Sequence, residues 1–324
     1  MVTNFFLIVN GMDAPMLQQF GCPCDRCAAG RRQANVSVSL IGLDEQGQTA
    51  VHVLFDVGAG VVNSLNQHPY LQKEKARLDW LCLTHWHPDH VLDINRLLVS
   101  RNLVTRRRTG QVPPRVPLWC RQGTALWLQK EHSYEWNNLV VPHVPDEQEP
   151  YGTLLATVPI NPDWGITITP VTTSHHTADS HPDDRAQTVY SCAGFIVETA
   201  VSKAALLWDL DSGNEWLSNP QTEKEKTAVA KLQHADHLFI DTSFWFAKPR
   251  RTTHPSFENI KPIAHNLQPR QTMLMHLSGH PDEPGNGAWG WTNGRWQAEA
   301  AHVWQQEGLP GIVRVPEIGD EFKL

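Results

Sequence analysis

The sequence lacks the long apolar run that a membrane-spanning helix requires. No apolar stretch in its 324 residues approaches the roughly 20 residues that cross a bilayer. Near the start, only residues 5–9 are continuously apolar, and they lack the cationic segment that begins a signal peptide. We therefore expect a cytoplasmic protein with no membrane partner.

Charge is also sparse. Charged residues make up 19% of the chain against 40% hydrophobic residues, and the formal net charge is −7. This composition excludes a disordered acidic tail, a collagen-like fibre and a strongly basic nucleic-acid-binding protein. The basic run Arg106, Arg107 and Arg108 has no long basic arm after it. We interpret it as a solvated loop and expect no nucleic-acid partner.

Cysteines are few, and a disulfide framework is not expected in a reducing compartment. Three of the six, Cys82, Cys120 and Cys192, stand among apolar residues and are expected in the core. The other three stand close together in the loop 21–27, as Cys22, Cys24 and Cys27. A cluster of this kind indicates a thiolate metal site.

Strand and helix patterns alternate along the whole chain without a repeat or a linker, which predicts one domain over residues 1–324. No glycine-rich nucleotide loop follows a predicted strand, so an α/β or α+β sandwich is favoured over a nucleotide-binding fold. Two ranges, 137–163 and 281–296, are expected to be long loop insertions. We predict strands at 5–10, 35–43, 51–57, 78–83, 116–120, 165–172, 193–198, 203–208, 238–242 and 271–276, and helices at 89–98, 223–234, 260–266 and 298–306.

Histidine is abundant, with 17 residues, and the most informative stretch lies between the predicted strand at 78–83 and the helix after it. There His85, His87, Asp89 and His90 follow one another within six residues. His85 and His87, two apart on extended backbone, can face one metal ion. Asp89 and His90 can face a second ion about 3.5–4 Å away. Four ligand-type residues at a strand exit predict a metal centre.

This H-x-H-x-D-H motif resembles that of the metallo-β-lactamase superfamily. The resemblance implies a four-layer αββα sandwich with a two-metal site, and it asks for three further ligands that each follow a strand. They are best matched by His175, Asp209 and His276, with His176 and Asp211 as rivals for the first two. It also implies that Asp56 hydrogen-bonds into the site from behind the ligands.

The cysteine loop at 21–27 carries a narrower resemblance. Its C-x-C-x2-C pattern is similar to that of the cyclic phosphodiesterase of phosphonate breakdown and, more distantly, of the B protein of pyrroloquinoline quinone biosynthesis. In the phosphodiesterase group this loop holds a structural zinc whose fourth ligand follows the last active-site histidine. His280 is the matching residue here, with a spacing one residue longer than the pattern.

Because the H-x-H-x-D-H motif is intact, whereas the quinone-pathway proteins typically have a degraded one, the resemblance implies a metal-dependent hydrolase. A small or cyclic phosphodiester substrate and a hydroxide activated by two divalent ions are expected. Zinc or manganese is expected, and iron is compatible with the same ligands. His254 is assigned as phosphate ligand or general acid, and Asp89 as secondary proton acceptor. Asp241, with Thr242 and Ser243, is expected to orient a metal-bound histidine.

Several alternatives stay open. Within the fold they are a tRNA-processing-type ribonuclease and a carboxylic ester or thioester hydrolase. From other classes they are an iron-dependent redox protein, a quinone-cofactor biosynthesis factor and a binding protein without turnover. Trp289, Trp291 and Trp296 indicate either a surface that stacks on a sugar or base, or the interface of a homodimer.

Overall fold

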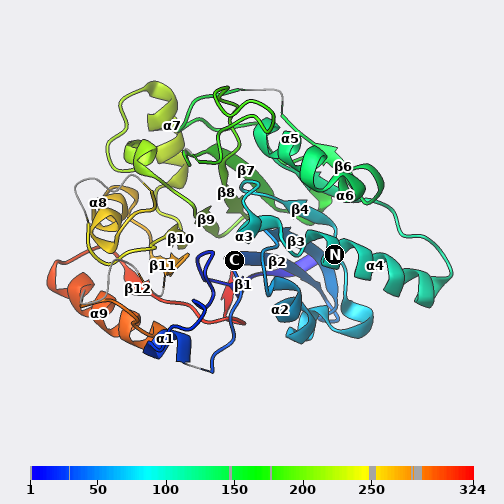
Figure 1. The fold of residues 1–324 in the computed structure, drawn as a ribbon, viewed down its shortest axis with the longest axis horizontal. Coiled ribbons are helices and arrows are strands. Elements are labelled where there is room, and N and C mark those ends of the chain that lie inside the picture. The colour runs from blue at the N-terminus through cyan, green and yellow to red at the C-terminus, as the bar shows by residue number, and fades with distance from the viewer. Residues whose placement is uncertain are drawn as a thin grey trace.

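Two β-sheets face each other across a shared hydrophobic core, and helices cover both outer faces (Figure 1). The computed structural model describes residues 2–28, 30–145, 148–175, 177–247, 253–278, 280 and 287–324. Between the sheets, Phe195 packs against Phe55 and Trp119, with ring centroids 5.1 and 5.2 Å apart. This arrangement is the predicted αββα sandwich.

The first sheet has the strand order β13-β1-β2-β3-β4-β5-β6. Its first part is antiparallel, and from β3 to β6 the strands run parallel. Side chains alternate, so that Phe55 points to the core between the sheets and Leu54 to the helices outside. The strands are β1 (Val2–Gly11), β2 (Ser37–Asp44), β3 (Thr49–Phe55), β4 (Trp80–Cys82), β5 (Val116–Trp119), β6 (Val140–His143) and β13 (Glu321–Lys323).

The second sheet has the order β12-β11-β10-β9-β8-β7, with β9 to β12 parallel and β7 and β8 antiparallel. Because β7 is two antiparallel steps from β9, the two strands run in the same direction. The strands are β7 (Thr167–Thr172), β8 (Ala193–Glu198), β9 (Lys203–Leu207), β10 (His237–Asp241), β11 (Gln271–Met275) and β12 (Ile312–Arg314).

The helices α2, α4 and α5 pack on the outer face of the first sheet, and α7, α8 and α9 on that of the second. In the described part of the chain, no helix is long and apolar enough to cross a membrane. The α-helices are α1 (Asp25–Ala28), α2 (Val61–Gln67), α3 (Pro88–Val91), α4 (Ile94–Thr109), α5 (Gln122–Glu131), α6 (Ser133–Asn138), α7 (Glu223–Leu232), α8 (Phe257–Leu267) and α9 (Asn293–Gln306). Short 3-10 helices are η1 (Pro69–Leu71), η2 (Lys73–Lys75), η3 (Pro162–Trp164) and η4 (Ser212–Leu217).

The loop predicted over 137–163 is partly wrong, because this range contains the edge strand β6. Pro142 hid the strand in the sequence, but an edge strand tolerates a proline since one side of its backbone needs no partner. Farther on, Leu155 and Val158 are buried in the core between the sheets. The chain here is therefore largely part of the framework.

The loop predicted over 281–296 is also partly wrong. Residues 281–286 lie outside the described residues, and α9 begins at Asn293. Trp291 and Trp296 are buried, with ring centroids 5.0 and 5.1 Å from that of Trp245. These two tryptophans fill the core under α9, so neither a stacking surface nor a dimer interface is available to them. Trp289 is half-buried beside the ring of His280, 5.5 Å away.

Candidate metal centre

The candidate ligands lie where strands of both sheets end. Asp56 follows β3, His85 follows β4, His175 follows β7, Asp209 follows β9 and His276 follows β11. Parallel strands end at the same edge of a sheet, so side chains from distant parts of the chain meet there. All five of these side chains are buried.

The backbone is strained at three of these strand exits and at His254, which lies shortly before α8. Asp56, Asp209, His254 and His276 have φ angles of 59°, 54°, 38° and 56°, in the left-handed region that non-glycine residues rarely adopt. Such a conformation costs about 1–3 kcal/mol and persists only where the surroundings enforce it. Its repetition around one cluster of side chains marks this cluster as the functional site.

One group of candidate ligands consists of His85, His87 and His175, whose potential ligand atoms all lie within 4.8 Å of one another. Asp209 lies beside this group, with 3.8 Å between its Oδ1 and Nε2 of His175. Burial lowers the pKa of His85 well below its usual value and that of His175 to about 4. Both imidazoles are therefore neutral, as metal ligands must be.

A second group consists of Asp89, His90, Asp209 and His276. Nε2 of His90 lies 2.8 Å from Oδ2 of Asp209, and Nε2 of His276 lies 3.3 Å from the same oxygen. Nε2 of His276 also lies 3.4 Å from Oδ2 of Asp89. Asp209 thus joins both groups, as expected of a bridging carboxylate.

The alternatives to His175 and Asp209 as ligands were His176 and Asp211. His176 lies outside the described residues. Asp211 caps η4, since its Oδ1 accepts a hydrogen bond from the backbone N–H of Gly213 at 2.8 Å. It belongs to neither ligand group among the described residues.

The donor set fits divalent cations. Among the described residues, four buried side-chain atoms of the site make no hydrogen bond: His85 Nε2, His90 Nε2, His175 Nδ1 and Asp209 Oδ2. Buried polar atoms rarely stay without partners, and all four belong to residues of the two ligand groups. Imidazole nitrogens and carboxylate oxygens are the ligands that zinc, manganese and iron accept. The two groups would hold two such ions, with Asp209 between them.

Behind the ligands, Asp56 holds His90 in place. Its Oδ2 accepts hydrogen bonds from His90 Nδ1 at 2.7 Å, from Trp208 Nε1 at 2.6 Å and from Thr84 Oγ1 at 2.6 Å. Its Oδ1 accepts the backbone N–H of Thr84 at 2.8 Å. The sequence predicts a supporting role for Asp56 but none for Thr84 or Trp208. A signal existed, since each stands directly before a candidate ligand at a buried strand end.

Asp241 holds two histidines. Its Oδ2 accepts a hydrogen bond from His254 Nδ1 at 2.8 Å. Its Oδ1 accepts the hydroxyl of Ser243 at 3.0 Å, and this hydroxyl lies 2.9 Å from His276 Nδ1. Thr242, expected to share this role, instead donates its hydroxyl to the carbonyl of Ile240. Although burial opposes it, His254 and His276 lower the pKa of Asp241 to about 2.

His254 lies at the rim of the site with 18% of its side chain exposed. Its ring stacks on that of His276, with centroids 4.7 Å apart and planes at 22°. Burial disfavours the protonated ring, but the Asp241 carboxylate outweighs burial and raises the pKa of His254. The side chain is therefore positioned close to the candidate ligands while keeping contact with solvent.

The loop that carries the H-x-H-x-D-H motif rests on the segment after β3. Val57 N donates to the carbonyl of His90 at 2.8 Å, and Asp93 N donates to the carbonyl of Val57 at 2.9 Å. These contacts divide the helix predicted over 89–98 into α3 and α4. A Cβ atom on Gly58 would lie 1.7 Å from the carbonyl oxygen of Asp89, so only glycine fits here.

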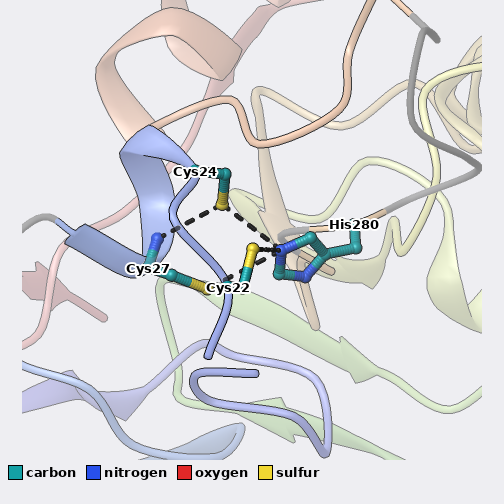
Figure 2. A group of neighbouring side chains, drawn as sticks. All are labelled: Cys22, Cys24, Cys27 and His280. Carbon is teal, nitrogen blue, oxygen red and sulfur yellow. Dashed lines mark hydrogen bonds between the residues drawn. The ribbon is translucent and has the colours of Figure 1, made fainter. Parts of the chain in front are cut away.

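The cysteine loop and His280 form a separate cluster (Figure 2). His280 Nε2 lies 3.0, 3.3 and 3.6 Å from the sulfur atoms of Cys22, Cys24 and Cys27. Three thiols and one imidazole at these distances match the closed tetrahedral ligand set of structural zinc sites. Arg26, between two of the cysteines, is buried and donates to Asp13 at 2.6 Å.

The middle of the chain, residues 52–277, matches the family model described as Beta-lactamase superfamily domain. The chain belongs to the metallo-β-lactamase superfamily. The predicted membership is confirmed, and the fold is that of a family of metal-dependent hydrolases. A search of curated proteins finds no significant match.

Solved structures of superfamily members resemble this chain over nearly its full length. A diphosphatase from the PhnP family is 21% identical with a TM-score of 0.62, and the match covers 100% of this chain and 98% of that one. Zn²⁺-bound PqqB from Methylobacterium extorquens is 14% identical with a TM-score of 0.64, covering 98% and 100%. YhfI from Bacillus subtilis is 16% identical with a TM-score of 0.60, covering 99% and 100%. At these identities the likeness shows the fold alone.

Proposed function

We propose that this protein is a metal-dependent phosphodiesterase that hydrolyses small or cyclic phosphodiesters. The observation that carries the proposal is the position of His254. It is not one of the seven predicted ligands, although its potential ligand atom lies within 4.8 Å of those of Asp209, Asp241 and His276. It is fixed by Asp241 at 2.8 Å, and 18% of its side chain is exposed. Hydrolysis of a phosphodiester needs such a group, because the departing alkoxide must receive a proton.

Each side chain then has a distinct task. His85, His87 and His175 would hold one ion, and Asp89, His90 and His276 the other, with Asp209 shared. Two divalent ions bound there lower the pKa of water and neutralise negative charge on a phosphate. Asp89 lies next to His276, where it also accepts a proton from the attacking water.

His254 uses Nδ1 to bind Asp241, which leaves Nε2 for the substrate. The protonated ring either binds a phosphate oxygen or donates its proton to the leaving oxygen. The partial exposure of the side chain lets a substrate reach it from solvent. One of the structural relatives is a diphosphatase, which also acts on a phosphate compound. A diphosphate, with its P–O–P bond, is therefore a substrate to test beside a phosphodiester, with its P–O–C bond.

The proposal is tested by hydrolysis of bis(p-nitrophenyl) phosphate on protein stripped by a chelator and refilled with zinc, manganese or iron. Turnover that requires an ion and is lost in Asp89→Ala supports it, with the exposed Asp163→Ala as matched control. Absence of turnover with every ion contradicts it. Parallel assays with a p-nitrophenyl carboxylic ester, a thioester and a diphosphate then identify the bond that is cleaved.

The same proposal assigns a structural zinc to Cys22, Cys24, Cys27 and His280 (Figure 2). A closed ligand set has no open position for substrate, so this ion stabilises the loop without taking part in the reaction. Metal analysis of Cys24→Ser should show one zinc less per chain, with a loss of stability of about 4 kcal/mol. An unchanged zinc content would contradict the assignment.

A further inference from the structure

A cavity lies on the outer side of the first sheet, lined by residues of α2, of α4 and of the loops beside them. Its volume is about 870 Å³, within the range of sites that hold small organic molecules. One wall is a single face of α4, with Leu97, Arg101, Val104 and Arg108 at successive turns. We call it the α2–α4 cavity. It uses none of the candidate metal ligands.

Apolar side chains line part of the α2–α4 cavity, beside polar and charged ones. Leu65, Leu71 and Leu78 line it and are nearly fully buried, with 6% exposure each. Val104 and Val112 line it nearer to solvent, with 39% and 68% exposure. Apolar side chains that face a hollow of this size gain free energy when an apolar group displaces water from it.

The charged side chains around the cavity are mostly positive. Lys73, Arg77, Arg101 and Arg108 line it together with a single carboxylate, that of Asp79. Asp79 is occupied, because both its oxygens accept hydrogen bonds from Arg77, at 2.6 and 2.8 Å. In a chain with net charge −7, this leaves a local excess of positive charge at an apolar cavity.

The two arginines of α4 that line the cavity, Arg101 and Arg108, are held in place without a carboxylate partner. Arg101 Nη1 donates to the carbonyl of Pro114 at 3.0 Å, and Arg108 Nη1 donates to that of Lys73 at 2.7 Å. Neither forms an ion pair within the part of the chain that the structure describes. A guanidinium carries five N–H donors, so most of their donors remain for an anion. Lys73 itself has a left-handed backbone, with φ 53°.

We propose that the α2–α4 cavity binds an amphipathic organic anion, whose apolar chain fills the space between the leucines and whose head group binds Arg101 and Arg108. The head group is a phosphate or a carboxylate, since both accept paired hydrogen bonds from guanidinium groups. The basic run 106–108, expected in a solvated loop, instead forms part of the last turn of α4, and the proposal gives a role to one of its arginines. Arg108 lines the cavity, whereas Arg106 and Arg107 do not.

The test measures binding by calorimetry to the metal-loaded full chain. The probes are hexyl, octyl and decyl phosphate, decanoate, decanol and inorganic phosphate, all below the concentrations at which they form micelles. Each methylene that the cavity buries should strengthen binding about fourfold. Decanol and inorganic phosphate should bind at least tenfold more weakly than decyl phosphate, and comparison with decanoate identifies the preferred head group.

Variants locate the binding. Arg101→Gln and Arg108→Gln should each weaken decyl phosphate binding about tenfold or more. Val104→Asp, at a partly exposed position on the same face, should weaken it further for the longer chains. Arg107→Gln, on the same helix but outside the cavity, is the matched control and should have no effect. Melting curves verify that each variant is folded.

The metal centre could itself bind a phosphate, and Asp209→Asn separates the two sites. Binding to the α2–α4 cavity persists in this variant and is lost in the arginine variants. The proposal is overturned if binding is lost in Asp209→Asn and retained in the arginine variants, if affinity does not depend on chain length, or if no amphipathic anion binds. None of these outcomes bears on the hydrolysis assay, so this proposal and the proposed function fail independently.

Discussion

His90 Nδ1 donates a hydrogen bond to Oδ2 of Asp56 at 2.7 Å, and both side chains are fully buried. Because Nδ1 is thereby occupied, Nε2 is the nitrogen that faces Asp209. The carboxylate therefore selects both the ring orientation and the tautomer of a candidate ligand that stands 34 residues away in the sequence.

Asp56→Asn should weaken metal binding at the histidine centre by 10- to 100-fold, roughly the usual effect of removing such a partner. The amide nitrogen would face N–H donors, so we also expect a loss of about 3 kcal/mol in the free energy of unfolding. Competition with a metal-binding dye and urea unfolding measure the two effects. The exposed Asp163→Asn should change neither, and an unaltered metal affinity in Asp56→Asn would refute the role of Asp56.

Asp209→Asn should reduce the histidine centre from two ions to at most one, because Asp209 belongs to one ligand group and its Oδ1 lies 3.8 Å from His175 Nε2 of the other. Native mass spectrometry counts the ions, and the zinc on the cysteine cluster serves as internal reference. Asp211→Asn is the matched control, since asparagine can keep the cap of η4. If Asp211→Asn loses ions and Asp209→Asn does not, the bridging ligand has been assigned to the wrong aspartate.

Gly58→Ala should displace the loop that carries Asp89, because the added Cβ would lie 1.7 Å from a backbone oxygen. We expect a loss of stability of about 3 kcal/mol or more, together with weaker metal binding. Gly294→Ala is the control: it lies in α9 with open space around it and should be neutral or stabilise by up to about 1 kcal/mol. Equal melting temperatures for the two variants would contradict the predicted clash.

His254→Gln should slow hydrolysis by about 10²- to 10⁴-fold for substrates with alkoxide leaving groups, which must be protonated as they depart. For p-nitrophenolate, a stable leaving anion, the effect should be much smaller. A plot of log kcat against leaving-group pKa, measured for wild type and variant, separates the two roles of His254. Loss of proton donation slows mainly the substrates with alkoxide leaving groups, whereas loss of phosphate binding slows alkoxide and p-nitrophenolate substrates alike. The exposed His302→Gln serves as control.

His52 predicts how stability depends on pH. Its ring is buried, its Nδ1 donates to the carbonyl of Arg77 at 2.6 Å, and its Nε2 lies 2.9 Å from the hydroxyl of Ser39. Burial lowers the pKa of His52 from 6.5 to about 4, although the hydrogen bond to the Arg77 carbonyl and the Asp79 carboxylate both act to raise it. Below pH 6.5, His52 binds a proton in the unfolded chain but stays neutral in the folded chain. The free energy of unfolding therefore falls as the pH falls from 6.5 to about 4.

The loss through His52 should amount to about 3 kcal/mol between pH 6.5 and pH 4. Urea unfolding at a series of pH values measures it. His52→Gln should be less stable at pH 7 but should show a flatter dependence over this range. A variant whose pH dependence equals that of wild type would assign the acid sensitivity to other groups.

Much of the framework could be predicted from local patterns. The strand Ala193–Glu198 lies where its apolar run indicated. The family and the fold could be predicted because the H-x-H-x-D-H motif is contiguous, and both predictions are confirmed. The prediction was wrong where local and tertiary signals disagree. Pro142 argues against a strand in the sequence, but a strand at the sheet edge can contain it. The tryptophans on either side of Gly290 suggest a binding surface, but in the structure Trp291 and Trp296 pack against Trp245 in the core under α9.

The sequence alone determined which side chains could act as ligands, since residue type and short spacing decide what a loop such as 84–90 can bind. Only the tertiary structure decided which of them meet. Trp208 reaches Asp56 across 152 positions and His280 reaches Cys22 across 258, and no local pattern encodes such pairs. The same holds for Asp209 and Asp211: both follow β9, but the left-handed backbone at Asp209 aims one carboxylate at the histidines, while the other caps a helix.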